Sequence, residues 1–196
     1  MSQTLHKYDP ERLCTYLQHH VAEFSELAEI VKFSDGQSNP TYKLTDTAGR
    51  HFVLRAKPPG TLLKSAHAVD REFRVMTALA TTAVPVPQML HLSGEDSPLG
   101  AQFLVMEHLE GRVFWDPALP EQSPKFRQDA YHALVRTLAA LHDVDPQAVG
   151  LADFGKPGNY FSRQVARWTG QYRACETQTR PDMDWTIAWL ERNMVP

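Results

Sequence analysis

The sequence predicts an α+β protein with a small antiparallel sheet in its first part and helices in its second part. Up to about residue 107, short runs of alternating apolar and polar residues are separated by clusters of turn residues, a pattern typical of short strands. Beyond that point the apolar residues recur at helical spacing. We therefore expect two parts, residues 1–107 and residues 108–196.

In the first part the residue patterns predict five strands and two helices. Asp9 and Pro10 are a favourable start for a helix, since one supplies a cap and the other fits the first turn. The predicted helices cover 10–21 and 69–80, and the predicted strands cover 29–34, 41–45, 51–57, 88–92 and 101–106. Because the first three strands are joined by short turns, we expect them to form an antiparallel meander.

In the second part the apolar spacing predicts three helices, over 124–144, 160–173 and 181–193. Trp168, Trp185 and Trp189 are the bulky packing groups expected on the last two of these helices.

Composition and charge exclude several classes of protein. The chain has 196 residues, 20 basic and 23 acidic side chains, and a formal net charge of −3, so no bulk charge points to nucleic acid or to an anionic membrane as partner. Two cysteines are too few for a disulfide framework or a four-thiolate zinc site. The sequence shows neither a signal-peptide pattern at its start nor an apolar run of ~18 residues, so a cytoplasmic location is expected.

Four features, in this order along the chain, could together bind a nucleotide. The first is the turn at 35–40, where Gly36 and the Ser38 and Asn39 side chains could contact phosphate oxygens; alone, it is simply a hairpin turn. The second is the strand over 51–57, where alternation places Val53 and Arg55 on the same face. A small apolar side chain could cover a purine, while the cation reaches its phosphates. By itself, Arg55 would be read as a solvated strand-end residue.

The other two features are Glu72 and the segment 103–111. Glu72 lies on the predicted helix over 69–80 and could pair with Arg55, although on its own it would be a solvent-facing carboxylate. The segment 103–111 is an apolar strand that ends near Gly111, as in a connector between two lobes. Its free backbone groups could form hydrogen bonds with the edge of a purine.

As a set, these features resemble the aminoglycoside phosphotransferase and choline kinase superfamily, whose fold is protein-kinase-like with two lobes. Within it, the likeness is to the kinase-like phosphotransferases associated with acyl-CoA dehydrogenases. The resemblance rests on Gly36–Tyr42, Phe52–Gly60, Ala68–Met76, Val84–Pro87, Val105–Gly111 and Tyr160–Trp168.

The resemblance implies a role for each matching position. Gly36, Gln37, Ser38, Asn39 and Thr41 would belong to the loop that covers the nucleotide. Arg55 would be the phosphate-pairing cation and Glu72 its helix partner, with Lys57 as a second candidate for the cation. Val53 and Met106 would line the adenine pocket, and the carbonyl of Glu107 and the N–H of Leu109 would pair with the adenine edge.

The resemblance also implies ATP (or GTP) and Mg²⁺ as cofactors, and transfer of phosphate to a hydroxyl of a small substrate whose identity stays open. In the superfamily a His-Gly-Asp motif supplies the catalytic aspartate, and this sequence does not contain it. We therefore expect no metal ligands within the chain, metal ligands beyond residue 196, and very weak catalysis by the chain alone. Asp153-Phe154-Gly155 spells the metal-holding tripeptide of protein kinases, but no catalytic loop precedes it, so a turn is predicted there.

Two other interpretations stay open from the sequence. The chain could be a non-catalytic nucleotide-binding module, similar to a pseudokinase, because the catalytic loop is missing. It could also handle acyl-CoA as a partner of a dehydrogenase, an idea that needs coenzyme A binding. If the chain is a fragment of a longer protein, exposed core surface favours self-association.

Overall fold

The computed structural model describes residues 9–33, 39–58, 67–94, 97–155 and 158–194. The chain forms two compact units, residues 1–150 and residues 151–196. The first unit contains the sheet and three helices, and the second contains two helices. The functional boundary expected after residue 107 stays a prediction, because a division into compact units says nothing about a nucleotide-binding lobe.

The first unit is built on one five-stranded antiparallel sheet, which confirms the predicted fold class. Its strands are β1 (Leu27–Lys32), β2 (Thr41–Asp46), β3 (His51–Ala56), β4 (Met89–Leu92) and β5 (Phe103–Glu107). They lie in the order β1-β2-β3-β5-β4, so the first three form the expected meander. β5 lies between β3 and β4, which places the end of β5 beside the centre of the sheet.

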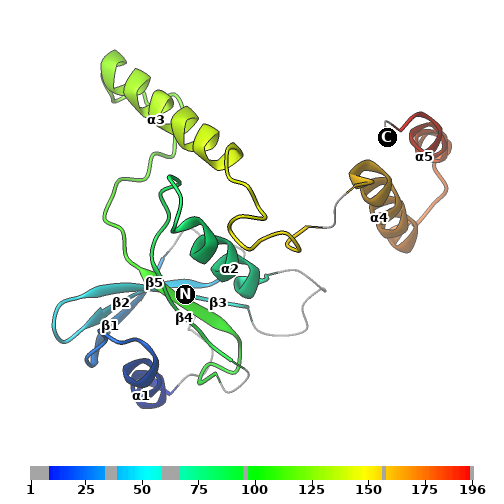
Figure 1. The fold of residues 1–196 in the computed structure, drawn as a ribbon. Coiled ribbons are helices and arrows are strands. Elements are labelled where there is room, and N and C mark those ends of the chain that lie inside the picture. The colour runs from blue at the N-terminus through cyan, green and yellow to red at the C-terminus, as the bar shows by residue number, and fades with distance from the viewer. Residues whose placement is uncertain (1–8, 34–38, 59–66, 95–96, 156–157, 195–196) are drawn as a thin grey trace. The chain divides into compact units, whose positions relative to one another are not determined.

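One face of the sheet forms the hydrophobic core with helix α1 (Pro10–His20). The alternation of each strand determines this face: Leu44 and Leu54 are completely buried, and so are Leu13 and Leu17 of α1. Helix α2 (Val69–Leu79) lies on the other side of the sheet in Figure 1.

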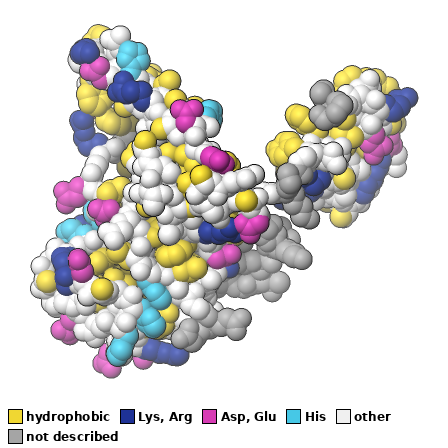
Figure 2. All heavy atoms as spheres, in the orientation of Figure 1, with side chains coloured by type: hydrophobic (Ala, Val, Ile, Leu, Met, Phe, Trp, Pro, Cys, Tyr) yellow, Lys and Arg dark blue, Asp and Glu magenta, His cyan; other side chains and the backbone are white. Residues whose placement is uncertain are grey.

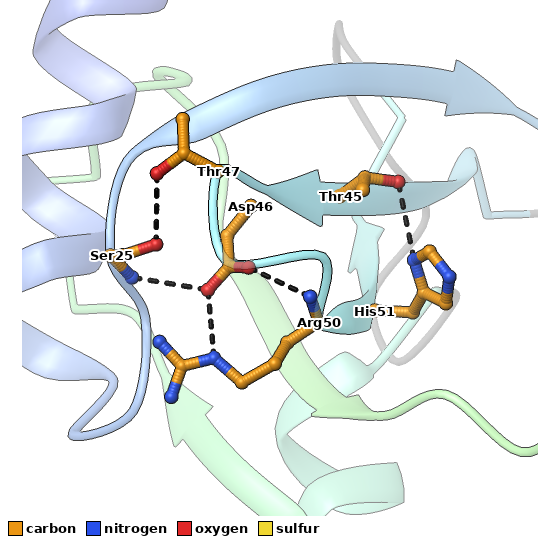
Figure 3. Close-up of polar contacts among 6 residues, drawn as sticks. All are labelled: Ser25, Thr45, Asp46, Thr47, Arg50 and His51. Atoms are coloured by element: carbon orange, nitrogen blue, oxygen red, sulfur yellow. Dashed lines mark hydrogen bonds and ion pairs between the residues drawn. The ribbon is translucent and has the colours of Figure 1, made fainter.

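The turn between β2 and β3 is held by a buried carboxylate, that of Asp46 (Figure 3). Its oxygens accept hydrogen bonds from the Arg50 backbone N–H at 2.8 Å, from Arg50 Nε at 2.9 Å and from the Ser25 N–H at 3.3 Å. Burial by itself would raise the pKa of Asp46, but these hydrogen bonds outweigh burial and lower the pKa from 3.8 to about 2. The ionised side chain thus ties the segment before β1 to the β2–β3 turn.

Three further helices present apolar side chains to solvent. Leu134 and Leu138 of α3 (Pro124–His142) are 62% and 49% exposed. In the second unit, Trp168 of α4 (Tyr160–Cys175) and Trp185 of α5 (Pro181–Asn193) are also exposed, and Figure 2 shows hydrophobic side chains on the surface of all three helices. The three tryptophans predicted as packing groups are therefore largely exposed, although the rings of Trp185 and Trp189 stack on each other with their centroids 6.4 Å apart.

Within the described residues, no helix combines the length and the apolar character that crossing a membrane requires.

Candidate functional site

The centre of the candidate site is an ion pair between β3 and α2. Arg55 Nη1 donates a hydrogen bond to Glu72 Oε1 at 2.9 Å, across 17 positions of sequence. The Arg55 side chain is 34% exposed and the Glu72 side chain 19%, so the pair lies at the edge of the solvent. The predicted pairing is present, and it fixes the guanidinium at the same face of β3 as Val53.

One of the guanidinium donors that the ion pair does not use is buried. Arg55 Nε is buried and has no hydrogen-bond partner among the described residues. Leaving a buried donor without a partner is unfavourable, and such groups call for a ligand, a water or a structural explanation. An anionic oxygen that reached this N–H would satisfy it.

A second cation lies one pleat further along the same strand face. Lys57 Nζ is 3.5 Å from Asp70 Oδ1, and the two side chains are 28% and 49% exposed. Lys57 and Arg55 thus pair with two carboxylates in the first turn of α2, Asp70 and Glu72, and Glu72 is the partner that the resemblance implies for Arg55. This arrangement favours Arg55 over Lys57 as the equivalent of the phosphate-pairing cation.

An open pocket of about 630 Å³ lies where β3 and β5 meet the connector that follows β5. Val53 and Met106 are direct cross-strand neighbours, and both line this pocket. Glu107 and Leu109, the two connector residues expected at the adenine edge, line it as well. The remaining lining residues are Phe33, Pro87, His108, Glu110, Gly111, Arg112 and Val113.

The backbone of the connector is partly used by the fold. The Glu107 N–H donates to the Gln88 carbonyl at 2.9 Å, and Glu107 Oε2 accepts from the Gln88 N–H at 3.1 Å. The Leu109 N–H, in contrast, forms no hydrogen bond with any other residue that the structure describes. A donor beside an apolar pocket is available at Leu109.

His108 is a pocket residue that the sequence reasoning missed. Its Nδ1 is buried and lacks a partner among the described residues, and its ring lies 5.6 Å from that of His51. Burial lowers the pKa of His108, and the nearby charges of Lys43 and His51 lower it further, while Glu110 has the opposite effect. The one signal in the sequence that could have identified His108 as a pocket residue was its position between Glu107 and Leu109, since any side chain of the connector can line the same pocket.

The predicted loop residues divide into two groups. Gly36, Gln37 and Ser38 lie outside the described residues. Asn39 is buried, and its carbonyl accepts a hydrogen bond from Thr41 Oγ1 at 3.0 Å. Asn39 and Thr41 therefore lie where the predicted loop joins β2. Thr41 is the cross-strand neighbour of Arg55.

For magnesium, the described residues offer no group of three or more His, Cys, Asp or Glu side chains that could hold a metal ion. Asp153 and Phe154 belong to a turn, in which the Phe154 N–H donates to the Leu151 carbonyl at 2.9 Å. The described residues thus offer a pocket beside β3 and β5 and, separately, an unpaired Arg55 N–H, but no metal-binding cluster.

Comparison with known proteins shows the family to which this chain belongs. The profile of the Phosphotransferase enzyme family matches residues 29–196. Among curated proteins, acyl-CoA dehydrogenase family member 10 of Mus musculus is 49% identical over 83% of this chain, and acyl-CoA dehydrogenase family member 11 of Rattus norvegicus is 42% identical over 96% of it. This chain spans only 15% and 25% of the length of these two relatives.

A solved structure supports the same placement. The crystal structure of a "putative aminoglycoside phosphotransferase" from Ralstonia eutropha superposes with a TM-score of 0.76 at 45% sequence identity. The match covers 96% of this chain and 54% of that chain. The protein-kinase-like α+β fold predicted from the sequence is thereby confirmed, and the chain belongs to the phosphotransferase enzyme family.

Proposed function

We propose that this chain is the nucleotide-binding part of a phosphotransferase that moves the terminal phosphate of ATP (or GTP) to a hydroxyl of a small molecule. The observation that carries the proposal is the placement of an apolar pocket and a fixed guanidinium on one face of β3, at Val53 and Arg55. Neither nucleic acid nor a membrane has a role in this proposal.

The base of the nucleotide would enter the pocket beside the connector. Val53 is 7% exposed and would contact the base from β3, while Met106 would contact it from β5. The Leu109 N–H would donate to the purine edge and the Glu107 carbonyl would accept from it. A volume of about 630 Å³ lies within the usual range of small-molecule sites.

The phosphates would extend toward Arg55. Side chains two residues apart on a strand are about 7 Å apart, so a base at Val53 places its phosphates near the guanidinium. Glu72 would hold the guanidinium, Arg55 Nε would donate to a phosphate oxygen, and Lys57 would add positive charge. Asn39 and Thr41, next to Arg55 at the start of β2, would lie beside the phosphates, while Gly36, Gln37 and Ser38 lie outside the described residues.

Mg²⁺ neutralises phosphate charge during phosphoryl transfer when it is bound. The described residues hold no metal-binding cluster, and the roles proposed for them are in binding the nucleotide.

The acceptor is the open part of this proposal. The names of the two mammalian relatives make coenzyme A and its thioesters the first acceptor-side ligands to test. The cytoplasmic location also stays a prediction.

A displacement assay tests the proposal and its two subsites. We expect a fluorescent ATP analogue to bind the chain, and both adenosine and triphosphate to displace it at high concentration. Val53→Trp, which fills the base pocket, should abolish displacement by adenosine. His132→Ala, an exposed histidine of α3, is the control and should bind as the wild type does. If the analogue does not bind, or if Val53→Trp binds it unchanged, the proposal is wrong.

A further inference from the structure

A histidine just before α2 has a strained backbone and a specific hydrogen bond. His67 has a φ of 59°, in the left-handed region that few residues other than glycine adopt. Its Nδ1 lies 2.8 Å from the Asn39 side-chain oxygen, across 28 positions of sequence. Because an amide oxygen only accepts, His67 Nδ1 donates this hydrogen bond. Unfavourable backbone of this kind persists only where surrounding contacts hold it.

The partner, Asn39, is fixed to the sheet. It is 9% exposed, and its carbonyl accepts from Thr41 Oγ1. The next residue, Pro40, accepts a hydrogen bond from the Ala56 N–H at 2.9 Å. The hydrogen bond from His67 thus joins the lead-in to α2 to the end of the β2–β3 pair where Arg55 lies.

The start of helix α2 is connected to the strands by side-chain contacts as well as by the buried side chain of Val69. Its N-cap residue is Ala68, which provides no capping hydrogen bond. Three side-chain contacts tie its beginning to the strands: Asn39–His67, Lys57–Asp70 and Arg55–Glu72. The two ion pairs are partly exposed, whereas Asn39, which accepts the hydrogen bond from His67, is buried. Water therefore competes less with the Asn39–His67 hydrogen bond than with either ion pair.

We propose that His67 is a positioning residue, which fixes the first turn of α2 through Asn39 and thereby holds Glu72 against Arg55. This inference rests on the proposed nucleotide site. In that site, His67 acts on the phosphate end through Glu72 and Arg55, and has no effect on the base end at Val53 and Met106. His67 therefore sets the affinity for ATP relative to adenosine.

The test is isothermal titration of the chain with ATP and with adenosine. We expect His67→Ala to weaken ATP binding about tenfold, as for the loss of one hydrogen bond, and to leave adenosine binding unchanged. His67→Asn tolerates the left-handed backbone and can donate from its amide, so it should retain ATP affinity within about threefold. In a Glu72→Gln background, His67→Ala should weaken ATP binding no further, because the group it positions has lost its charge. His132→Ala is the matched histidine control.

The outcomes separate this inference from the function on which it rests. If the wild type binds neither ATP nor adenosine, the proposed function and the inference fail together. If the wild type binds both and His67→Ala leaves the ATP-to-adenosine ratio unchanged, the inference alone is overturned. A fall in melting temperature with an unchanged ratio overturns it as well, since His67 would then only stabilise the fold.

Discussion

Replacing Asp46 with asparagine removes the charge from a carboxylate whose side chain is completely buried, and around which the fold places three N–H donors. An asparagine of the same shape would turn one acceptor oxygen into an NH₂ group. Whichever way the amide is oriented, at least one donor from Arg50 or Ser25 would then face another donor. The substitution therefore tests whether this buried carboxylate holds the β2–β3 turn.

The magnitude follows from the partners of the carboxylate. A buried donor left without an acceptor costs about 1–3 kcal/mol, and hydrogen bonds to a charged group are worth more than those to a neutral one. Because the Arg50 side chain is 42% exposed, water can solvate part of what it loses. We expect Asp46→Asn to lower the free energy of unfolding by about 3 kcal/mol.

The assay is urea unfolding at neutral pH, followed by circular dichroism, with Asp129→Asn as the control. Asp129 is also in an i,i+4 pair, with Lys125 at 2.7 Å, but the two side chains are 56% and 77% exposed. An exposed pair of this kind contributes about 0.5 kcal/mol or less. If the two substitutions lower the free energy of unfolding by the same amount, burial does not determine the strength of these ion pairs and the reasoning is refuted.

The pH dependence has a definite sign. The folded pKa of Asp46 is lowered from 3.8 to about 2, so its stabilising effect is complete above the unfolded pKa and is lost as the pH falls through about 2. The difference in stability between the wild type and Asp46→Asn should therefore be largest above about pH 5 and should shrink steadily toward pH 2. A difference that stays constant over this range would contradict the lowered pKa.

Three further predictions concern the candidate site and the core. Glu72→Gln should weaken ATP binding about tenfold by titration calorimetry, because the Arg55 guanidinium loses its charged partner; unchanged binding would mean that the pair is only structural. Leu109→Pro removes an N–H that has no partner among the described residues, and it should weaken ATP binding. Leu109→Ala changes only a side chain that is 59% exposed, and it should leave ATP binding unchanged. Equal effects of the two substitutions would exclude a role for the backbone donor. Leu54→Ala removes a completely buried core side chain and should lower the free energy of unfolding by about 2–5 kcal/mol in urea; a cost below 1 kcal/mol would argue against the buried position.

Much of the fold could be predicted because its signals are local. The alternation in β2 and β3 determines which residues face α1, and the short turns determine that the strands are antiparallel. The same alternation placed Val53 and Arg55 on one face. The residues alone offered Glu72 as one partner that Arg55 could have, and the resemblance to a family singled out this pairing, since no local pattern joins residues 17 positions apart.

The contacts that could not be predicted join distant parts of the chain. Ser25 reaches Asp46 across 21 positions, and His67 reaches Asn39 across 28. Neither pair has a spacing that a helix or a hairpin would produce, so only the packing of the tertiary structure reveals them. The helical spacing of apolar residues predicted the helix over 124–144, but Leu134 and Leu138 on it are exposed, because periodicity shows only that a face is apolar and not whether the described chain covers it.

The most direct test of a nucleotide site on the shared face of β3 is a crystal structure of the chain with a non-hydrolysable ATP analogue. We expect the adenine between Val53 and Met106 with its edge at the Leu109 N–H, and a phosphate oxygen within hydrogen-bond distance of Arg55. An analogue bound elsewhere, or its absence from crystals grown at saturating concentration, would contradict the account.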